Sequence, residues 1–177
     1  LENKIEADLI GKQSVHMLNP LNVEMSNLRT SLLPGLLKTA DYNIKHGNLN
    51  FRLFEIGQTH YIDDSLDNIY VENKSIAAII HGNEKNVSIN SNEIKENILN
   101  LKGVIVSIFR KKLNMNLKFN NETHPAFSFA KKIIINNLDV GILGEINSNW
   151  IKILKLDLTT IYGFELNLTP IKEMILN

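Results

Sequence analysis

The chain has 177 residues, 44% of them hydrophobic and 21% charged, which is the composition of an ordinary globular domain with a sizeable core. Nineteen basic and nineteen acidic residues cancel, so net charge argues against a stand-alone nucleic-acid binder or a membrane-surface protein. The lack of cysteine excludes disulfides, thiolate metal sites and cysteine nucleophiles, and the sequence shows neither a signal peptide nor an apolar run of membrane-spanning length.

The first 18 residues carry a weak pattern. Ile5, Leu9 and Ile10 could begin a helix that Gly11 ends, and residues 15–18 read as a short strand. This stretch therefore predicts only a lead-in to the clearer segment that follows.

A capped helix is predicted after this lead-in. Ser31 is expected to cap it, and Pro34 lies in its first turn, where a missing N–H is harmless. Lys45 and His46 suit the negative end of the helix, and Gly47 supplies the stop. One helical face collects the apolar side chains of Leu33, Leu36, Leu37, Ala40 and Ile44.

Two strands are expected next. Residues 51–62 carry bulky side chains on both alternating faces, which predicts a strand in the centre of a sheet. Residues 75–81 form a continuous apolar run that Gly82 closes, as in a strand buried on both faces. Polar connections are expected at 63–67 and 83–90.

A helix of about four turns is predicted to begin at Ser91. Glu93 lies in its first turn, and Arg110, Lys111 and Lys112 lie at its far end, where cations favour the helix dipole. Its apolar stripe consists of Ile94, Ile98, Leu101, Ile105 and Ile108.

The remaining elements are mostly strands. We predict a short strand at 117–119, a hairpin over 127–146, a short helix through Leu154 capped by Ser148 or Asn149, a strand at 159–168 and a terminal helix from Pro170. Because strands mostly follow strands, the order favours an α+β fold with an antiparallel sheet flanked by helices. We expect residues 1–177 to form one module.

Two motifs resemble a known family. Residues 19–37 read NPLNVEMSNLRTSLLPGLL and residues 52–57 read RLFEIG, and together they are similar to the core module near the C-terminal end of the beta subunit of bacterial phenylalanyl-tRNA synthetase. The LKG run at 101–103 and the GE pair at 144–145 extend the resemblance along the chain. It implies a fold like the class II aminoacyl-tRNA synthetase core and a fragment of a longer beta subunit.

The resemblance also implies a function. The beta copy of this core is catalytically inert, and it supports assembly with the catalytic alpha subunit in an α2β2 enzyme that joins phenylalanine to its tRNA. The whole enzyme would use ATP and Mg²⁺ in the cytoplasm, without a membrane, whereas this fragment would hold no cofactor. A free-standing relative that binds an amino acid or a nucleotide is the alternative, and a plain RNA-binding module is a third.

No catalytic residue is expected. Tyr61 stands about where synthetase cores carry an arginine that holds the ATP phosphate, and the strand around Gly163 has one glycine and no arginine after it. Adenylation needs fixed cations around the phosphates. A metal site is not expected either, because the five histidines lack metal-ligand spacing and the aspartates at 63, 64 and 67 lack a calcium-loop pattern.

Six residues are expected to form a subunit interface or a structural brace. Arg29 either contacts the alpha subunit or pairs with Glu24 or Glu55, since its fork suits a carboxylate. The full set is Leu28, Arg29, Ser31, Leu32, Leu33 and Glu55.

Lysines in the second half could contact the tRNA backbone in the assembled enzyme, or could form an ordinary solvated surface. They are Lys111, Lys112, Lys131 and Lys132, with Lys118 nearby. His124 and Pro125 match the start of a His-Pro-Gly-Arg stretch in the family, but Ala126 and Phe127 replace its last two residues.

Overall fold

A six-stranded antiparallel sheet forms the centre of the computed structural model, which describes residues 10–20, 26–63, 69–84, 94–157 and 160–176. The strand order is β1-β2-β8-β7-β6-β5. The strands are β1 (Phe51–Asp63), β2 (Ile69–His81), β8 (Tyr162–Asn167), β7 (Leu138–Ile146), β6 (Phe127–Ile135) and β5 (Leu117–Glu122). The predicted α+β fold with an antiparallel sheet is confirmed.

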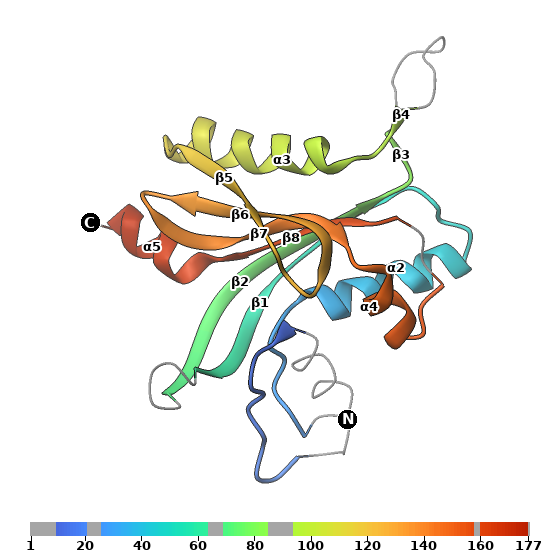
Figure 1. Ribbon diagram of the computed structural model, residues 1–177, viewed down its shortest axis with the longest axis horizontal. Coiled ribbons are helices and arrows are strands. Elements are labelled where there is room, and N and C mark those ends of the chain that lie inside the picture. Colours follow the sequence, from blue (N-terminus) through green and yellow to red (C-terminus); the bar gives the residue numbers. More distant parts are fainter. Residues whose placement is uncertain (1–9, 21–25, 64–68, 85–93, 158–159, 177) are drawn as a thin grey trace.

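Helices cover both faces of this sheet (Figure 1). On one face, α2 (Leu33–Lys45) and α4 (Ser148–Ile153) pack in a core that includes Leu37 and Trp150. On the other face, α3 (Ile98–Val106), the π-helix η3 (Ser107–Lys112) and α5 (Leu168–Leu176) pack in a second core that includes Leu143 and Phe164. The sheet therefore separates two apolar cores.

Helix α2 forms because its apolar positions recur on one face. Leu33, Leu36, Leu37 and Ala40 are buried, and Ile44 packs against the same core. The N-cap residue is Leu32 rather than Ser31, although the Ser31 hydroxyl accepts a hydrogen bond from the Leu33 N–H at 3.1 Å. Gly47, with φ of 81°, lies just after the helix, as predicted.

The prediction that residues 51–62 form a central strand was wrong. Strand β1 lies at the edge of the sheet, with Phe54 71% and Ile56 52% exposed. One alternating set of β1 side chains faces the core on the α2 side, and the other set faces solvent. Because apolar residues also occur on the solvent-facing side, the sequence of β1 has the pattern of a strand that is covered on both faces.

The predicted start of the long helix was also wrong. Ile94 lies in strand β4 (Ile94–Lys95), which pairs with β3 (Asn83–Glu84), while Ser91 and Glu93 lie outside the described residues. Helix α3 begins after Asn97, whose side chain accepts from the Leu99 N–H at 2.8 Å. This N-cap is part of a capping box with Asn100, so the local caps define the start of the helix.

The far end of this helix changes its period. After Val106 the chain continues as η3, in which hydrogen bonds span one more residue than in an α-helix. This shift places Phe109 in the core at 4% exposure and turns Ile108 outward at 44% exposure. The predicted apolar stripe ended at Ile108, but the buried residue at this end of the helix is Phe109, one position later.

The predicted hairpin and final elements are present with small shifts. Asn136 and Asn137 join β6 to β7 with φ of 50° and 64°, which is the backbone of a tight type I′ turn. Helix α4 is capped by Asn147 instead of Ser148 or Asn149, because the Asn147 side chain accepts from the Asn149 N–H. Helix α5 already begins at Leu168, before Pro170.

The lead-in has little regular structure of its own. Most of the tentative helix near Ile10 lies outside the described residues, and instead of a strand at 15–18 the structure has two isolated bridges, Gln13 with Ile62 and His16 with Asn27. None of the helices in the described ranges has the length and apolar character needed to cross a membrane.

Candidate functional site

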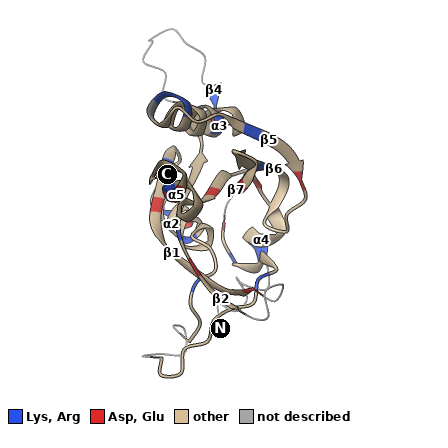
Figure 2. Ribbon diagram, turned by 90° about the vertical axis from the view of Figure 1, so that its left-hand side faces the viewer, with Lys and Arg blue, Asp and Glu red and all other residues tan. Residues whose placement is uncertain are grey.

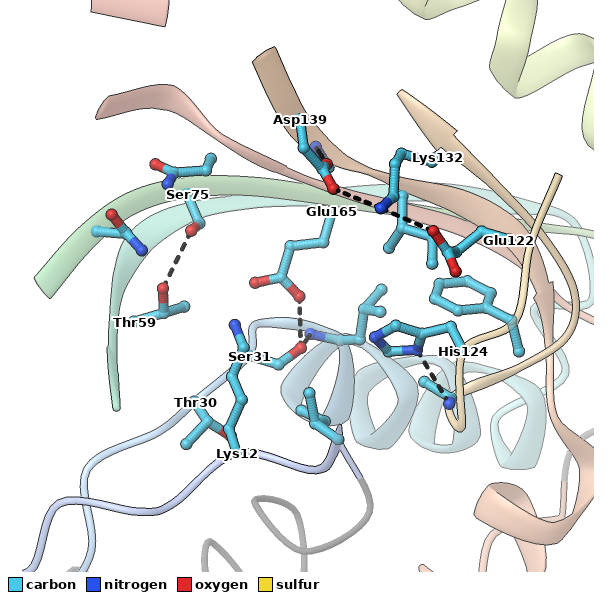
Figure 3. Close-up of a pocket in the computed structure, with 18 of the residues that line it drawn as sticks. Lys12, Thr30, Ser31, Thr59, Ser75, Glu122, His124, Lys132, Asp139 and Glu165 are labelled. Atoms are coloured by element: carbon cyan, nitrogen blue, oxygen red, sulfur yellow. Dashed lines mark hydrogen bonds and ion pairs between the residues drawn. The ribbon is translucent and has the colours of Figure 1, made fainter. Parts of the chain in front are cut away.

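A polar pocket of about 470 Å³ opens on the sheet face that carries α2 (Figure 3). Its walls come from all six strands of the sheet, from α2 and α4, from the turn before β6 and from the segment around Lys12. The labelled side chains in Figure 3 converge on this space from elements that are far apart in the sequence. The antiparallel sheet thus gathers residues from both ends of the chain.

Glu165 connects the centre of the sheet to the start of α2. Its carboxylate accepts hydrogen bonds from the Ser31 hydroxyl and from the Leu32 N–H, the latter at 3.3 Å. Burial raises the pKa of Glu165 above its ordinary value, although the Ser31 hydrogen bond, the Lys12 charge, the Leu32 N–H and the Arg29 charge oppose this rise. A carboxylate at this helix end is favourably placed in the helix dipole.

Lys12 faces the same pocket from the N-terminal segment. Its amine lies 4.3 Å from the centroid of the Tyr61 ring, so a cation–π contact holds it. Burial lowers the pKa of Lys12, while the charges of Glu165 and Asp63 oppose this change. Lys12 and Glu165 attract each other across the pocket, but they do not form a direct ion pair (Figure 3).

Lys132 on β6 is the second cation of the pocket. Its amine lies 2.8 Å from Glu122 and 3.0 Å from Asp139. Hydrogen bonds and charge from these two carboxylates raise the pKa of Lys132 to about 12. The ion pair and a hydrogen bond from the Thr123 N–H lower the pKa of Glu122. This lysine is therefore already neutralised by two anions.

His124 closes the pocket beside α2. Its Nδ1 accepts a hydrogen bond from the Ala126 N–H at 3.1 Å, which leaves the proton of the neutral ring on Nε2. The ring meets Phe127 edge-on with 5.5 Å between centroids. Burial and the nearby Lys12 charge lower the pKa of His124, so the neutral form is favoured.

The opposite side of the pocket is lined by hydroxyl and amide groups. Thr59 on β1 and Ser75 on β2 lie 3.1 Å apart between their hydroxyl oxygens, and Asn73 and Asn167 flank them. Among the described side chains, no group of three histidine, aspartate or glutamate residues is placed to hold a metal ion.

The expected pairing of Arg29 with Glu55 is present. Their side chains lie 2.6 Å apart, and Arg29 also donates to the backbone carbonyl of Gln58 at 2.9 Å. Gly57 leaves room for this guanidinium, because a Cβ atom there would lie 2.1 Å from Arg29 Nη2. Glu24, the other expected partner, lies outside the described residues. This geometry braces the lead-in of α2 against β1.

The other expected brace residues lie at or near the core. Leu32 and Leu33 are buried at 1% and 2% exposure, Ser31 bonds to Glu165, and Leu28 is half-buried. Within the module these side chains stabilise the fold, so Leu32 and Leu33 have no surface to offer a partner.

The expected basic residues are distributed over different surfaces. Lys131 and Lys132 are neighbours on β6 and therefore point to opposite faces of the sheet. Lys131 bonds to Asn121 at 2.8 Å, and Lys111 is exposed on η3. Basic and acidic segments are interspersed over the ribbon in Figure 2. A tRNA contact of these residues, with Lys112, stays a prediction.

Sequence reasoning missed the Lys12 and Glu165 pair and the Glu122–Lys132–Asp139 group. Glu165 carried one usable signal, since it is a charged residue within the otherwise apolar strand β8. Lys12 carried none, because only the fold brings the N-terminal segment to the last strand.

These features define a class of protein. The six-stranded antiparallel sheet with helices on both faces is the fold of the class II aminoacyl-tRNA synthetase core. A solved pyrrolysyl tRNA synthetase from Desulfitobacterium hafniense superposes with a TM-score of 0.68 over 92% of this chain and 53% of that one. Sequence identity between the two is 12%, so the likeness concerns the fold alone.

The chain belongs to the family described as the phenylalanyl tRNA synthetase beta chain CLM domain, whose model matches residues 2–168. A phenylalanine–tRNA ligase beta subunit of Protochlamydia amoebophila is 28% identical over 90% of this chain and 20% of its own length. The beta subunit of Methanococcus maripaludis is 33% identical over 95% of this chain and 29% of its own. The chain thus spans less than a third of these relatives.

Proposed function

We propose that this chain is a non-catalytic core module of a phenylalanyl-tRNA synthetase beta subunit that supports assembly with the catalytic alpha subunit. The complete α2β2 enzyme would attach phenylalanine to its tRNA in the cytoplasm, using ATP and Mg²⁺ bound outside this module. Family membership and the names of the relatives support this assignment.

The observation that carries the non-catalytic role is the charge of the pocket. The pocket is lined by three carboxylates and two amines, and no arginine is found among the described lining residues. The carboxylates are those of Glu122, Asp139 and Glu165, and the amines are those of Lys12 and Lys132. Arg29 pairs with Glu55 and Arg52 pairs with Glu96. A triphosphate would therefore meet more anions than cations, whereas adenylation needs an excess of positive charge.

Pyrophosphate exchange by the assembled enzyme tests this conclusion. The variant Lys132→Met in the beta subunit removes one of the two cations that line this pocket, and we expect the exchange rate to stay within about twofold of wild type. A loss of about a hundredfold, in an enzyme that still assembles, would show that the pocket takes part in catalysis.

The assembly role is supported by exposed apolar side chains. Phe54 and Ile56 project from the edge strand β1, and Phe54 is the most exposed large apolar side chain on any described strand. Large exposed apolar residues at an edge strand are typical of an interaction surface. We include them in the surface that contacts the alpha subunit.

Co-purification tests this role. The double variant Phe54→Ser/Ile56→Ser, placed in the full beta subunit, is expected to lose association with the alpha subunit while the unfolding temperature of the beta subunit is retained. Leu138→Ser is the matched control, since Leu138 is 51% exposed at the far hairpin. Undiminished assembly and aminoacylation by the double variant would contradict this interface.

A further inference from the structure

We propose that an apolar groove on the other face of the sheet binds the alkyl chain of a medium-chain carboxylate, whose carboxylate contacts Lys172 at the edge of the groove. The groove lies on the face that carries α3 and α5, opposite the polar pocket, and has a volume of about 320 Å³. This volume is at the lower end of the range for small-molecule sites. The binding is independent of the assembly role.

Parts of the sheet and of the helical segments above it enclose the groove. Strands β2 and β8 line it from the sheet, α5 lines it from one helix, and the end of α3 with η3 and Leu113 completes the lining. Five of these side chains are at most 4% exposed, so the inner part of the groove is built from the second core. They are Ile105, Phe109, Phe164, Leu166 and Ile171.

The lining of the groove favours an alkyl chain over a polar ligand. Among the described residues that line it, Lys172 alone has a polar side chain. A ligand group that needs hydrogen bonds would lose water there without gaining a partner, whereas each methylene group that enters the groove gains free energy by leaving water. The groove therefore suits a chain without internal polar groups.

Lys172 supplies the contact for the charged end of the ligand. It is exposed on α5, and none of the ion pairs between described residues involves it. The residues one turn away on its own helix are not acidic, so α5 offers its amine no carboxylate at that spacing. A lysine stem can lie along an apolar wall while the amine stays in water. A ligand carboxylate at this edge therefore gains a partner.

The π-helix η3 shapes the open side of the groove. Its wider turn accompanies the burial of Phe109 in the inner part and the position of Ile108 on the open side, at 44% exposure. Ile175 and Leu176 of α5 are also on the open side, at 51% and 73% exposure. π-helical turns are rare and frequently occur at functional sites. A bound alkyl chain would remove these apolar side chains from water.

Isothermal titration of the chain with three probes tests the site. Octanoate and hexanoate differ by two methylene groups, and octylammonium carries the opposite charge on a chain of the same length. We expect octanoate to bind with a Kd of about 1 mM or tighter, hexanoate about tenfold more weakly, and octylammonium at least about threefold more weakly. Octanoate binding should also show a negative heat-capacity change, which marks the burial of apolar surface.

Substitutions at the edge of the groove assign the two parts of the ligand. Ile108→Ser should weaken octanoate binding by at least about threefold. Val104→Ser is the matched control and should leave it within about twofold, because Val104 is 42% exposed on the preceding turn but does not line the groove. Lys172→Glu should reverse the charge preference, so that octylammonium binds more tightly than octanoate. Thermal unfolding confirms that each variant is folded.

Three outcomes would overturn the proposal. They are equal binding of octanoate and hexanoate, an unchanged charge preference in Lys172→Glu, and no binding of octanoate. In the last case, a dimer in sedimentation that Ile108→Ser dissociates would assign the groove to a second copy of the chain. The assembly and exchange experiments are unaffected by each of these outcomes.

Discussion

Arg29 connects the segment before α2 to strand β1 through two contacts. Its guanidinium pairs with Glu55 at 2.6 Å and donates to the Gln58 carbonyl at 2.9 Å. Because the two charged side chains are 40% and 35% exposed, solvent screens the ion pair. The Gln58 hydrogen bond is independent of the charge on Glu55.

This geometry predicts unequal effects of removing each partner. Glu55→Gln should lower the free energy of unfolding by about 0.2–1 kcal/mol. Arg29→Met should lower it by about 1 kcal/mol more, because the Gln58 carbonyl loses its donor as well. Urea unfolding of both variants and of the double variant measures the coupling, and equal losses for the two single variants would contradict this assignment.

Lys132 predicts a dependence of stability on pH. Its pKa is raised to about 12 in the folded protein against an ordinary value of 10.5, so the stability it contributes is complete below 10.5 and is lost as pH rises toward 12. The difference in unfolding free energy between wild type and Lys132→Met should therefore be constant at moderately alkaline pH and should shrink above pH 10.5.

Urea unfolding across this pH range measures the difference. Lys118→Met on the neighbouring strand is the control, since Lys118 is exposed. The two variants can be compared by their differences in unfolding free energy from wild type. If the difference for Lys132→Met follows that for Lys118→Met up to pH 12, then Glu122 and Asp139 do not stabilise the charged lysine.

Two glycines, one in a strand and one in a helix, differ in the space that a Cβ atom would have. Gly144 in β7 packs against its neighbour β6 so closely that a Cβ atom would lie 2.2 Å from the Phe129 carbonyl oxygen and 2.6 Å from the Phe127 ring. Gly103 in α3 is exposed, and beyond its own turn of helix no atom lies within 4 Å of such a position. The same substitution therefore has opposite consequences in the two elements.

Alanine at both positions tests this contrast. Gly144→Ala should lower the free energy of unfolding by about 1–3 kcal/mol, because strand backbone must move. Gly103→Ala should raise it by about 0.5–1 kcal/mol through helix propensity. Thermal unfolding of the two variants gives the signs, and a neutral Gly144→Ala would mean that β6 and β7 separate more easily than their packing indicates.

Local chemistry explains which elements were predictable from sequence. Helix α2 and the β6–β7 hairpin follow from apolar spacing and from turn residues such as Asn136 and Asn137, so their prediction needed no tertiary information. The edge position of β1 and the register shift at η3 depend on what packs against them. The pocket depends on Lys12 meeting Glu165, which only the complete sheet topology determines.

At the scale of the molecule, one sheet holds two cores together. Leu37 belongs to the core under α2, Leu143 belongs to the core under α3, and both are fully buried. Trp150, the single tryptophan of the chain, lies in the first core and reports on it by fluorescence. The shared strands make cooperative unfolding the expected behaviour.

Cavity-forming substitutions test this cooperativity. Leu37→Ala and Leu143→Ala should each lower the free energy of unfolding by about 2–5 kcal/mol. Both should shift the Trp150 fluorescence transition and the far-ultraviolet circular dichroism transition by the same amount. A Leu143→Ala variant whose Trp150 transition stays at the wild-type midpoint would show that the two cores unfold separately.

The edge strand β1 has a consequence for the isolated chain. The last part of this 13-residue strand is bonded to the lead-in through the His60 and Ile62 N–H groups, whereas Phe54 and Ile56 lie on the earlier part of the same margin. Such a margin is a template for intermolecular strand pairing, so the purified chain should self-associate into β-rich aggregates at high concentration. A lysine in place of Ile56 would act as a gatekeeper against this association and would make concentrated samples of the chain easier to handle.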